Sequence, residues 1–338
     1  MSVIKSPSYP ILSLGLLACL AIMGLILWLG PYSLGIQFLP DSGFEWYYWK
    51  LPEPTFITRL TAWSGYALHQ VFLWGLIWYA RKTRPIYAPG LHPINIVALA
   101  GNAFFVLLHI AQTRWTYDGL AQDTSVMSSQ ASVVFMLVFI LIMENRRRGL
   151  FFGKKVGFVD AMGDFLRQYH GYYFSWAIIY TFWFHPIETT LGHLMGTFYI
   201  LMLLLQGSLF FTRSHLRRGW TTLLEVFVLL HGVVVAYIAV QQDAAGMFFF
   251  GFLFLFVVTQ MHGLRWHKSV RWIITLLSIA AVFIVYWAQP KDAIEVLRIP
   301  LAEYGFVIFI AGVYYLVTRF LNGSAQDKSA LQETTEVL

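Results

Sequence analysis

The chain has 338 residues, of which 58% are hydrophobic and only 12% are charged. A soluble domain carries roughly 25% charged residues, so this composition excludes a soluble globular protein and indicates that lipid surrounds much of the surface. The net charge of +6 comes from short basic clusters between apolar runs. That distribution is typical of membrane topology signals, and we therefore expect no nucleic-acid partner.

Long apolar runs follow one another from the first residues to the last quarter of the chain. A helix needs about 20 apolar residues to span the hydrocarbon layer, and we predict about ten such helices. The expected ranges are 11–30, 56–80, 93–113, 128–143, two within 169–211, 220–240, 245–261, 272–288 and 301–321. The predicted fold class is therefore all-α, a polytopic integral membrane protein. The first run is expected to stay uncleaved, because a signal peptide has a shorter apolar core.

Basic clusters alternate with acidic, mixed or short loops along the predicted helices. They follow the second, fourth, sixth and eighth helices, at 81–84, 146–155, 213–218 and 265–271. The positive-inside rule then places both termini in the cytoplasm. Because no organelle-targeting signal is evident, we expect a bacterial inner membrane.

We expect one transmembrane domain over residues 1–321. The polar residues 322–338 are expected to form a disordered cytoplasmic tail. The amphipathic segment 156–168 is expected to lie at the membrane interface.

The densest chemistry in the sequence lies in the polar turn HPIETT, between the fifth and sixth predicted helices. This turn carries His185 and Glu188, and His193 follows it closely. A turn this short requires the two helices to be antiparallel neighbours, which places His185 and His193 within several ångströms of each other. The charge alternation puts the turn on the non-cytoplasmic side.

Further histidines lie inside predicted helices: His69 and His231 near the midplane and His109 in the outer third. Polar groups within a bilayer are costly and ordinarily face a partner or a cavity. Imidazole and carboxylate groups ligate zinc, iron and copper. The predicted metal ligands are His109, His185, Glu188, His193 and His231.

Two other interpretations of these histidines are open. A histidine in a membrane helix often donates a hydrogen bond to a neighbouring helix and has no other role. His69 and His231 form the alternative pair, either as a proton relay or as the two axial ligands of a single haem. Haem is the weaker of the cofactor predictions.

The motifs of the common membrane enzymes are missing from the sequence: HExxH, paired histidine boxes, GxSxG and the Walker A loop. The grouping of the outer histidines and Glu188 leads us to expect an enzyme that acts on a lipid-soluble small molecule. Its centre would be histidine-rich, with or without a metal, and would lie in the outer half of the membrane. The alternatives are a proton-coupled transporter or channel and a haem-binding electron-transfer subunit. The single cysteine, Cys19, excludes a CxxC redox pair and an intramolecular disulfide.

Overall fold

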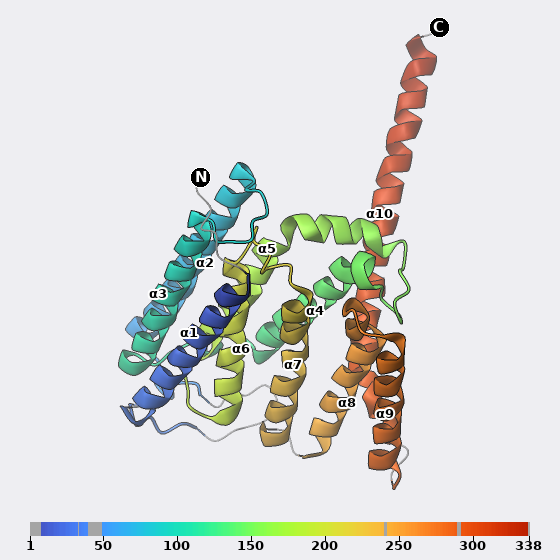
Figure 1. Cartoon of the computed structure of the whole chain (residues 1–338). Helices are drawn as coiled ribbons and strands as arrows, with labels where there is room; N and C mark the ends of the chain where they lie inside the picture. Colours follow the sequence, from blue (N-terminus) through green and yellow to red (C-terminus); the bar gives the residue numbers. More distant parts are fainter. Residues whose placement is uncertain (1–7, 33, 40–48, 240–241, 289–291, 337–338) are drawn as a thin grey trace. The chain divides into compact units, whose positions relative to one another are not determined.

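The computed structural model describes residues 8–32, 34–39, 49–239, 242–288 and 292–336 (Figure 1). Over these residues the chain forms ten α-helices and four short 3-10 helices. The α-helices are α1 (Ser8–Leu29), α2 (Phe56–Thr83), α3 (Pro93–Trp115), α4 (Val126–Arg148), α5 (Val159–Phe184), α6 (Leu191–Ser208), α7 (Arg218–Ala239), α8 (Gln242–Val258), α9 (Lys268–Tyr286) and α10 (Arg298–Glu336). The 3-10 helices are η1 (Gly30–Tyr32), η2 (Leu120–Gln122), η3 (Gln260–Gly263) and η4 (Asp292–Leu297).

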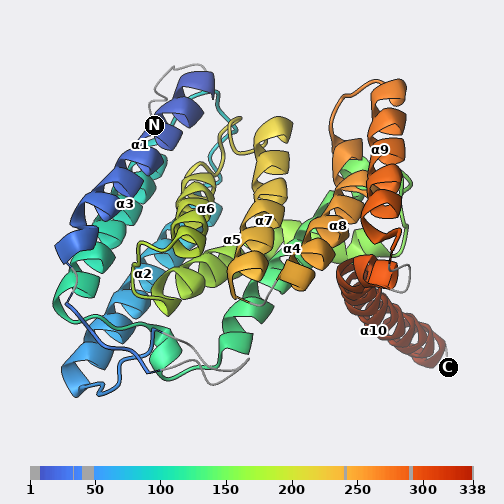
Figure 2. The same ribbon diagram turned by 90° about the horizontal axis from the view of Figure 1, so that it is seen from below.

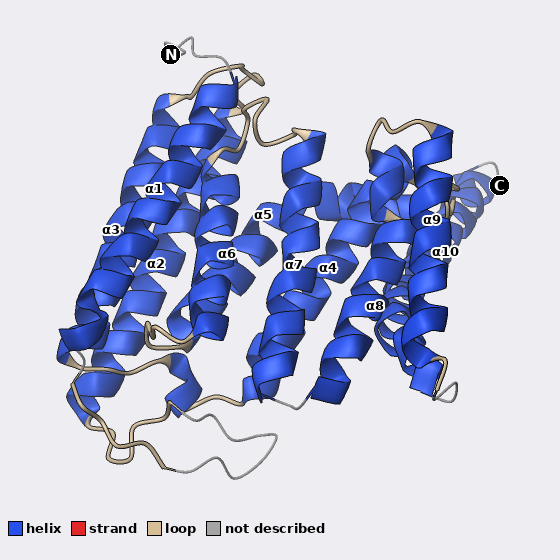
Figure 3. Cartoon of the chain, turned by 60° about the horizontal axis from the view of Figure 1, so that its bottom comes forward, coloured by secondary structure: helices blue, strands red, loops and turns tan. Residues whose placement is uncertain are grey.

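No strand occurs in the part of the chain that the structure describes, and the connections there are turns and loops (Figure 3). The predicted all-α class is confirmed for these residues. Eight of the helices are long and apolar enough to cross a membrane, which indicates a multi-pass integral membrane protein. The other two, α2 and α5, are long enough but more polar, because α2 carries His69 and Gln70 and α5 carries Arg167, Gln168 and His170 beside several Tyr and Trp side chains.

The chain divides into two compact units. Unit 1 comprises Met1–Met136 and Gly171–Phe249, and unit 2 comprises Leu137–His170 and Phe250–Leu338. Helices α4 and α5 therefore contribute one part to each unit. The single domain over residues 1–321 and the disordered tail over 322–338 stay predictions; α10 continues to Glu336, and its side chains beyond Leu321 lie outside the described residues.

Helix α6 is the centre of unit 1 and packs against α1, α3 and α7, while α2 packs along α3 (Figure 2). Small residues permit these close approaches, since a glycine lets two helix backbones come near. Gly15 of α1 lies against the side chain of Leu205 on α6, and Gly101 of α3 lies against the ring of Phe72 on α2. The resulting core positions the ends of α5 and α6, where the predicted site lies.

Unit 2 contains an apolar core formed by α4, α5, α8 and α10. Leu141, Leu255 and Val307 are fully buried in it. On its edge, the hydroxyl groups of Thr259 and Tyr304 lie 2.7 Å apart and link the end of α8 to α10. Burial of apolar side chains thus stabilises the unit, and the Thr259–Tyr304 contact adds a polar link between α8 and α10.

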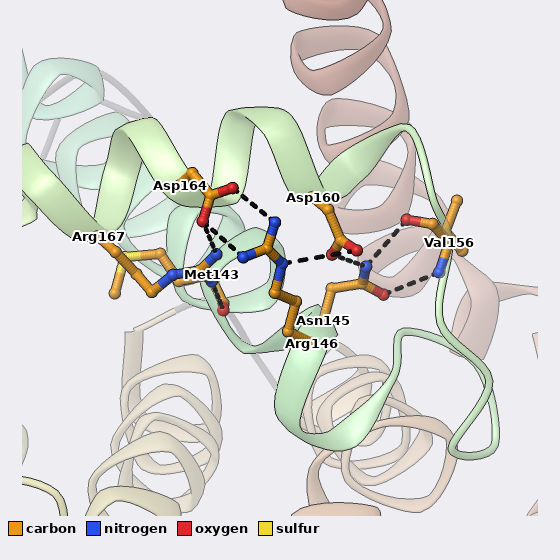
Figure 4. Close-up of polar contacts among 7 residues, drawn as sticks. All are labelled: Met143, Asn145, Arg146, Val156, Asp160, Asp164 and Arg167. Atoms are coloured by element: carbon orange, nitrogen blue, oxygen red, sulfur yellow. Dashed lines mark hydrogen bonds and ion pairs between the residues drawn. The ribbon is translucent and has the colours of Figure 1, made fainter.

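A group of polar contacts joins the end of α4 to the start of α5 (Figure 4). Arg146 donates two hydrogen bonds to Asp164, at 2.8 and 2.5 Å, and Asn145 donates to Asp160 at 2.9 Å. Arg167 donates to the carbonyl oxygen of Met143 at 2.6 Å. The hydrogen bond from Arg167 and the nearby charge of Arg146 lower the pKa of Asp164 below its usual value. The predicted amphipathic segment 156–168 is therefore largely the first part of α5, fixed to α4 by charged groups.

Candidate functional site

The turn between α5 and α6 forms where the sequence predicts it. Helix α5 ends at Phe184 because Pro186 follows, and the residue before a proline disfavours helical backbone. Helix α6 begins at Leu191, after Thr190 at its N-cap in extended conformation. His185 therefore lies just beyond one helix, and His193 lies in the first turn of the next.

Two hydrogen bonds hold this turn against α3. The ring nitrogen Nε2 of His109 donates to the carbonyl oxygen of His185 at 2.8 Å. The amide of Ile187 donates to the hydroxyl of Thr113 at 3.0 Å. The backbone of the turn is thereby fixed, and the side chains of His185 and His193 have defined positions.

His185 and His193 lie next to each other, as the short turn predicts. Their ring centroids are 5.4 Å apart, and the rings meet edge to face at 83°. The ring of His193 also meets the ring of Trp49 edge to face, with the centroids 5.5 Å apart. Both histidines are half-buried. Within the described residues no hydrogen bond engages a ring nitrogen of His193, so this imidazole is available to another molecule.

His231 of α7 reaches the same part of α6. Its Nε2 atom lies 2.8 Å from the position that a Cβ would take on Gly196. A Cβ on Gly192 would likewise lie 3.4 Å from the side chain of Val235 on α7. Because these two glycines of α6 have no side chain, α7 packs close to α6 at this point. Because Gly196 is three residues beyond His193, the imidazole of His231 lies less than one helical turn further along α6.

Glu188 bonds to a residue that we did not predict from the sequence. The hydroxyl of Tyr117 donates a short hydrogen bond to Oε1 of Glu188. Tyr117 is 4% exposed and adopts a left-handed backbone with φ of 45° just beyond α3. The ring centroid of Phe38 lies 5.5 Å from that of Tyr117. Next along this loop, burial raises the pKa of the Asp118 carboxyl.

His109 is fully buried, and its ring lies against the protein on both sides. Besides the bond from Nε2 to the His185 backbone, its Nδ1 lies 2.9 Å from Oε1 of Gln112. The amide of Gln112 donates in turn to the carbonyl oxygen of Asp118 at 3.1 Å. Both ring nitrogens of His109 thus face protein oxygen atoms, and the bond from Nε2 ties α3 to the turn.

His69 belongs to a separate buried chain of hydrogen bonds across four helices. Trp183 of α5 donates to Nδ1 of His69 at 3.3 Å, and Nε2 of His69 lies 2.7 Å from Oδ1 of Asn102 on α3. Asn102 donates to the hydroxyl of Ser208 on α6 at 2.8 Å, and Ser208 donates to the carbonyl oxygen of Leu204. Since an amide oxygen only accepts, His69 carries its proton on Nε2. Both ring nitrogens of His69 are therefore engaged in hydrogen bonds within the protein.

The predicted metal centre receives no support from this geometry. Among the residues that the structure describes, no group of three or more His, Cys, Asp or Glu side chains is placed to hold a metal ion. His185, His193 and His231 approach one another around α6, but His109 meets the turn through a backbone oxygen and Glu188 accepts from Tyr117. Metal binding by His109, His185, Glu188, His193 and His231 stays a prediction.

The helices define a multi-pass integral membrane protein, with a histidine group around the α5–α6 turn. Comparison with protein-family models, with curated proteins and with solved structures finds no match. Function is therefore inferred from the residues of this chain alone.

Proposed function

We propose that the protein is a membrane-embedded enzyme that acts on a lipid-soluble molecule at the outer ends of α5 and α6. The observation that carries the proposal is the position of His193. Its half-buried imidazole lies 5.4 Å from that of His185, and no hydrogen bond among the described residues engages its ring nitrogens. A histidine in such a place can transfer a proton to or from a bound molecule.

The groups around His193 suit this role. His185 and His231 place two more imidazoles beside the same turn of α6, and Trp49 supplies an aromatic face. We propose that His193 is the proton donor or acceptor and that His231 hydrogen-bonds the substrate. A zinc, iron or copper ion shared by His185 and His193 is a variant of the same proposal, because imidazole nitrogens ligate these metals.

The substrate class follows from the proposed membrane placement. With ten spans, both termini in the cytoplasm and the α5–α6 turn on the outer side, the site borders the outer leaflet. A lipid-soluble molecule reaches such a site from the bilayer. The proposed location is the inner membrane of a bacterium.

A proton-coupled transporter is the less well supported function. It requires a histidine near the midplane that gains and loses a proton, and the predicted candidates were His69 and His231. The ring of His69 accepts from Trp183 and donates to Asn102, so a relay through His69 would break a satisfied pair of bonds. Haem ligation by His69 meets the same obstacle.

The experiment compares the purified full-length protein with two variants in lipid nanodiscs. His193→Ala removes the proposed acid–base group, and His267→Ala removes an exposed histidine at the start of α9 as the matched control. Each sample is incubated with a total lipid extract from the producing cells, and the extract is analysed by mass spectrometry. Metal content and the absorption spectrum are measured on the same samples.

We expect one lipid-soluble compound to be consumed by the unaltered protein and by His267→Ala, but not by His193→Ala. Equal consumption by His193→Ala would reject the proposal for this site. Stoichiometric metal that is present in the unaltered protein and lost in His193→Ala would support the version of the proposal in which a metal ion is shared by His185 and His193. A Soret band that is unchanged in His193→Ala would instead favour haem chemistry elsewhere.

A further inference from the structure

Unit 2 contains a buried carboxyl group that is separate from the histidine site. Glu303 lies in the second turn of α10 and is 4% exposed. Its Oε2 atom is buried, and no hydrogen-bond partner for that atom is found among the described residues. A carboxylate in this position would be an uncompensated buried charge, which is strongly unfavourable.

The neighbours of Glu303 along α10 show what it faces. Residues four apart lie on one face of a helix, so Glu303 lies between Ile299 and Val307. Ile299 packs against Gly251 of α8, where an added Cβ would lie 3.0 Å from the Cβ of Ile299. Val307 is fully buried in the apolar core of unit 2. Glu303 therefore lies on the face of α10 that packs against α8 and the apolar core of unit 2.

Among the residues that the structure describes, no basic side chain forms an ion pair with Glu303. From Ala245 to Val258, α8 carries no titratable side chain. On α10 the adjacent Tyr304 shares a hydrogen bond with Thr259, and Arg298 is paired with Glu295 at 3.0 Å. The remaining charged or titratable groups of the packed elements lie at helix ends: Glu144 and Arg146 to Arg148 on α4, Asp160, Asp164 and Arg167 on α5, His262 on η3 and Arg271 on α9.

We propose that Glu303 is a proton-binding site within the membrane: a carboxyl group that carries a proton in the apolar core of unit 2 and exchanges it reversibly. Placing an ionisable group inside a membrane helix costs free energy, so such a group is a candidate for a functional role. The proposal is independent of the histidine site in unit 1.

A protonated carboxyl in an apolar setting has a specific chemical signature. An apolar carbodiimide reaches it from the bilayer, since Leu301 and Phe306 on the flanking faces of α10 are 68% and 40% exposed. The carboxyl O–H adds across one C=N bond of the reagent: the proton goes to nitrogen, and the carboxyl oxygen bonds to the central carbon. The acyl group then moves from oxygen to nitrogen and gives a stable N-acylurea, with no leaving group. The ionised carboxylate lacks the proton that this addition consumes.

The test treats the full-length protein in liposomes with dicyclohexylcarbodiimide or with a water-soluble carbodiimide. Peptide mass mapping identifies the modified residue, and the labelling rate is measured from pH 6 to pH 10. We expect dicyclohexylcarbodiimide to label Glu303 at least about tenfold faster than the soluble reagent does, because the site excludes water and charged reagents. The rate should fall at high pH along a single-proton curve.

Two isosteric variants complete the test. Glu303→Gln should abolish the labelling, whereas Glu295→Gln, which alters the ion-paired carboxyl just before α10, should retain it. Labelling of Glu303 by both reagents at equal rates would overturn the proposal, as would no labelling of Glu303 in folded protein. A rate that does not depend on pH would overturn reversible proton exchange. The pH profile uses the unaltered protein, so it decides the question even when Glu303→Gln does not fold.

Discussion

The hydrogen-bond chain through His69 allows a quantitative prediction about stability. Replacing Asn102 with leucine removes the bonds to His69 at 2.7 Å and to Ser208 at 2.8 Å, and it leaves the Nε2–H group of His69 buried without an acceptor. Hydrogen bonds between membrane helices contribute about 0.6 kcal/mol on average and about 1.7 kcal/mol at most. An unsatisfied buried polar group costs a further 1–3 kcal/mol, roughly. We therefore expect Asn102→Leu to lower the free energy of unfolding by about 2–4 kcal/mol.

A double-mutant cycle isolates the bond between His69 and Asn102. His69→Leu alone leaves the amide oxygen of Asn102 buried and unpaired, whereas the variant with both leucines has no orphaned group at this contact. The loss in the double variant should therefore be smaller than the sum of the single losses by about 1–2 kcal/mol. The measurement is unfolding in mixed micelles with increasing dodecyl sulfate, followed by circular dichroism.

The control cycle pairs Asn102→Leu with His267→Leu, whose side chain is exposed. Those two losses should add to within about 0.5 kcal/mol. Equal additivity in the His69 cycle would refute the reasoning, because it would mean that the two buried side chains do not depend on each other. A second outcome would also contradict the reasoning: His69→Leu is as stable as the unaltered protein but loses a Soret band. That result would support haem ligation by His69.

Three further predictions concern other parts of the fold. Asp164→Asn should lower the melting temperature at pH 7, and the difference from the unaltered protein should vanish in acid. The pKa of Asp164 is lowered in the folded protein, so the carboxylate stabilises the fold at pH values above its unfolded-state pKa of about 3.9. That stabilisation is lost as the pH falls through the folded-state pKa. Gly65→Ala should destabilise unit 1 by about 1–3 kcal/mol, because the added Cβ would lie 2.2 Å from the ring of Trp183. Gly75→Ala is the control: its added Cβ would have no atom within 4 Å, and the variant should be as stable as the unaltered protein or more so in the same thermal assay. Gly196→Ala should displace the α7 imidazole and reduce turnover of the substrate while the far-ultraviolet circular dichroism spectrum stays unchanged, and full turnover would count against a role for that imidazole.

The helices were predictable because their signal is local. An apolar run of about 20 residues in lipid has to satisfy its own backbone hydrogen bonds, which a helix does. The predicted range 245–261 accordingly corresponds to α8 at Gln242–Val258. Helix ends were less predictable: α4 continues to Arg148, beyond the expected end at residue 143, because basic residues are favourable at a helix C-terminus.

The site was predictable only where chain connectivity fixes it. The short turn requires His185 to lie near His193, and the ring centroids are 5.4 Å apart. The bond from Tyr117 to Glu188 depends on the path of a loop 71 residues away in sequence, which no local pattern encodes. Glu303 was missed for a related reason. The predicted helix begins at residue 301, which places a glutamate at a membrane edge, and its burial results from packing against α8.

The central claim is that His193 and His231 act on the substrate as parts of one site. The most direct test is the rate of substrate conversion in nanodiscs by His193→Ala, His231→Ala and the double variant, with each protein checked for folding by circular dichroism. Groups that act as a unit give strongly non-additive effects, so we expect the double variant to be about as slow as the slower single variant. Independent, multiplicative losses, or full activity of His193→Ala, would contradict the claim.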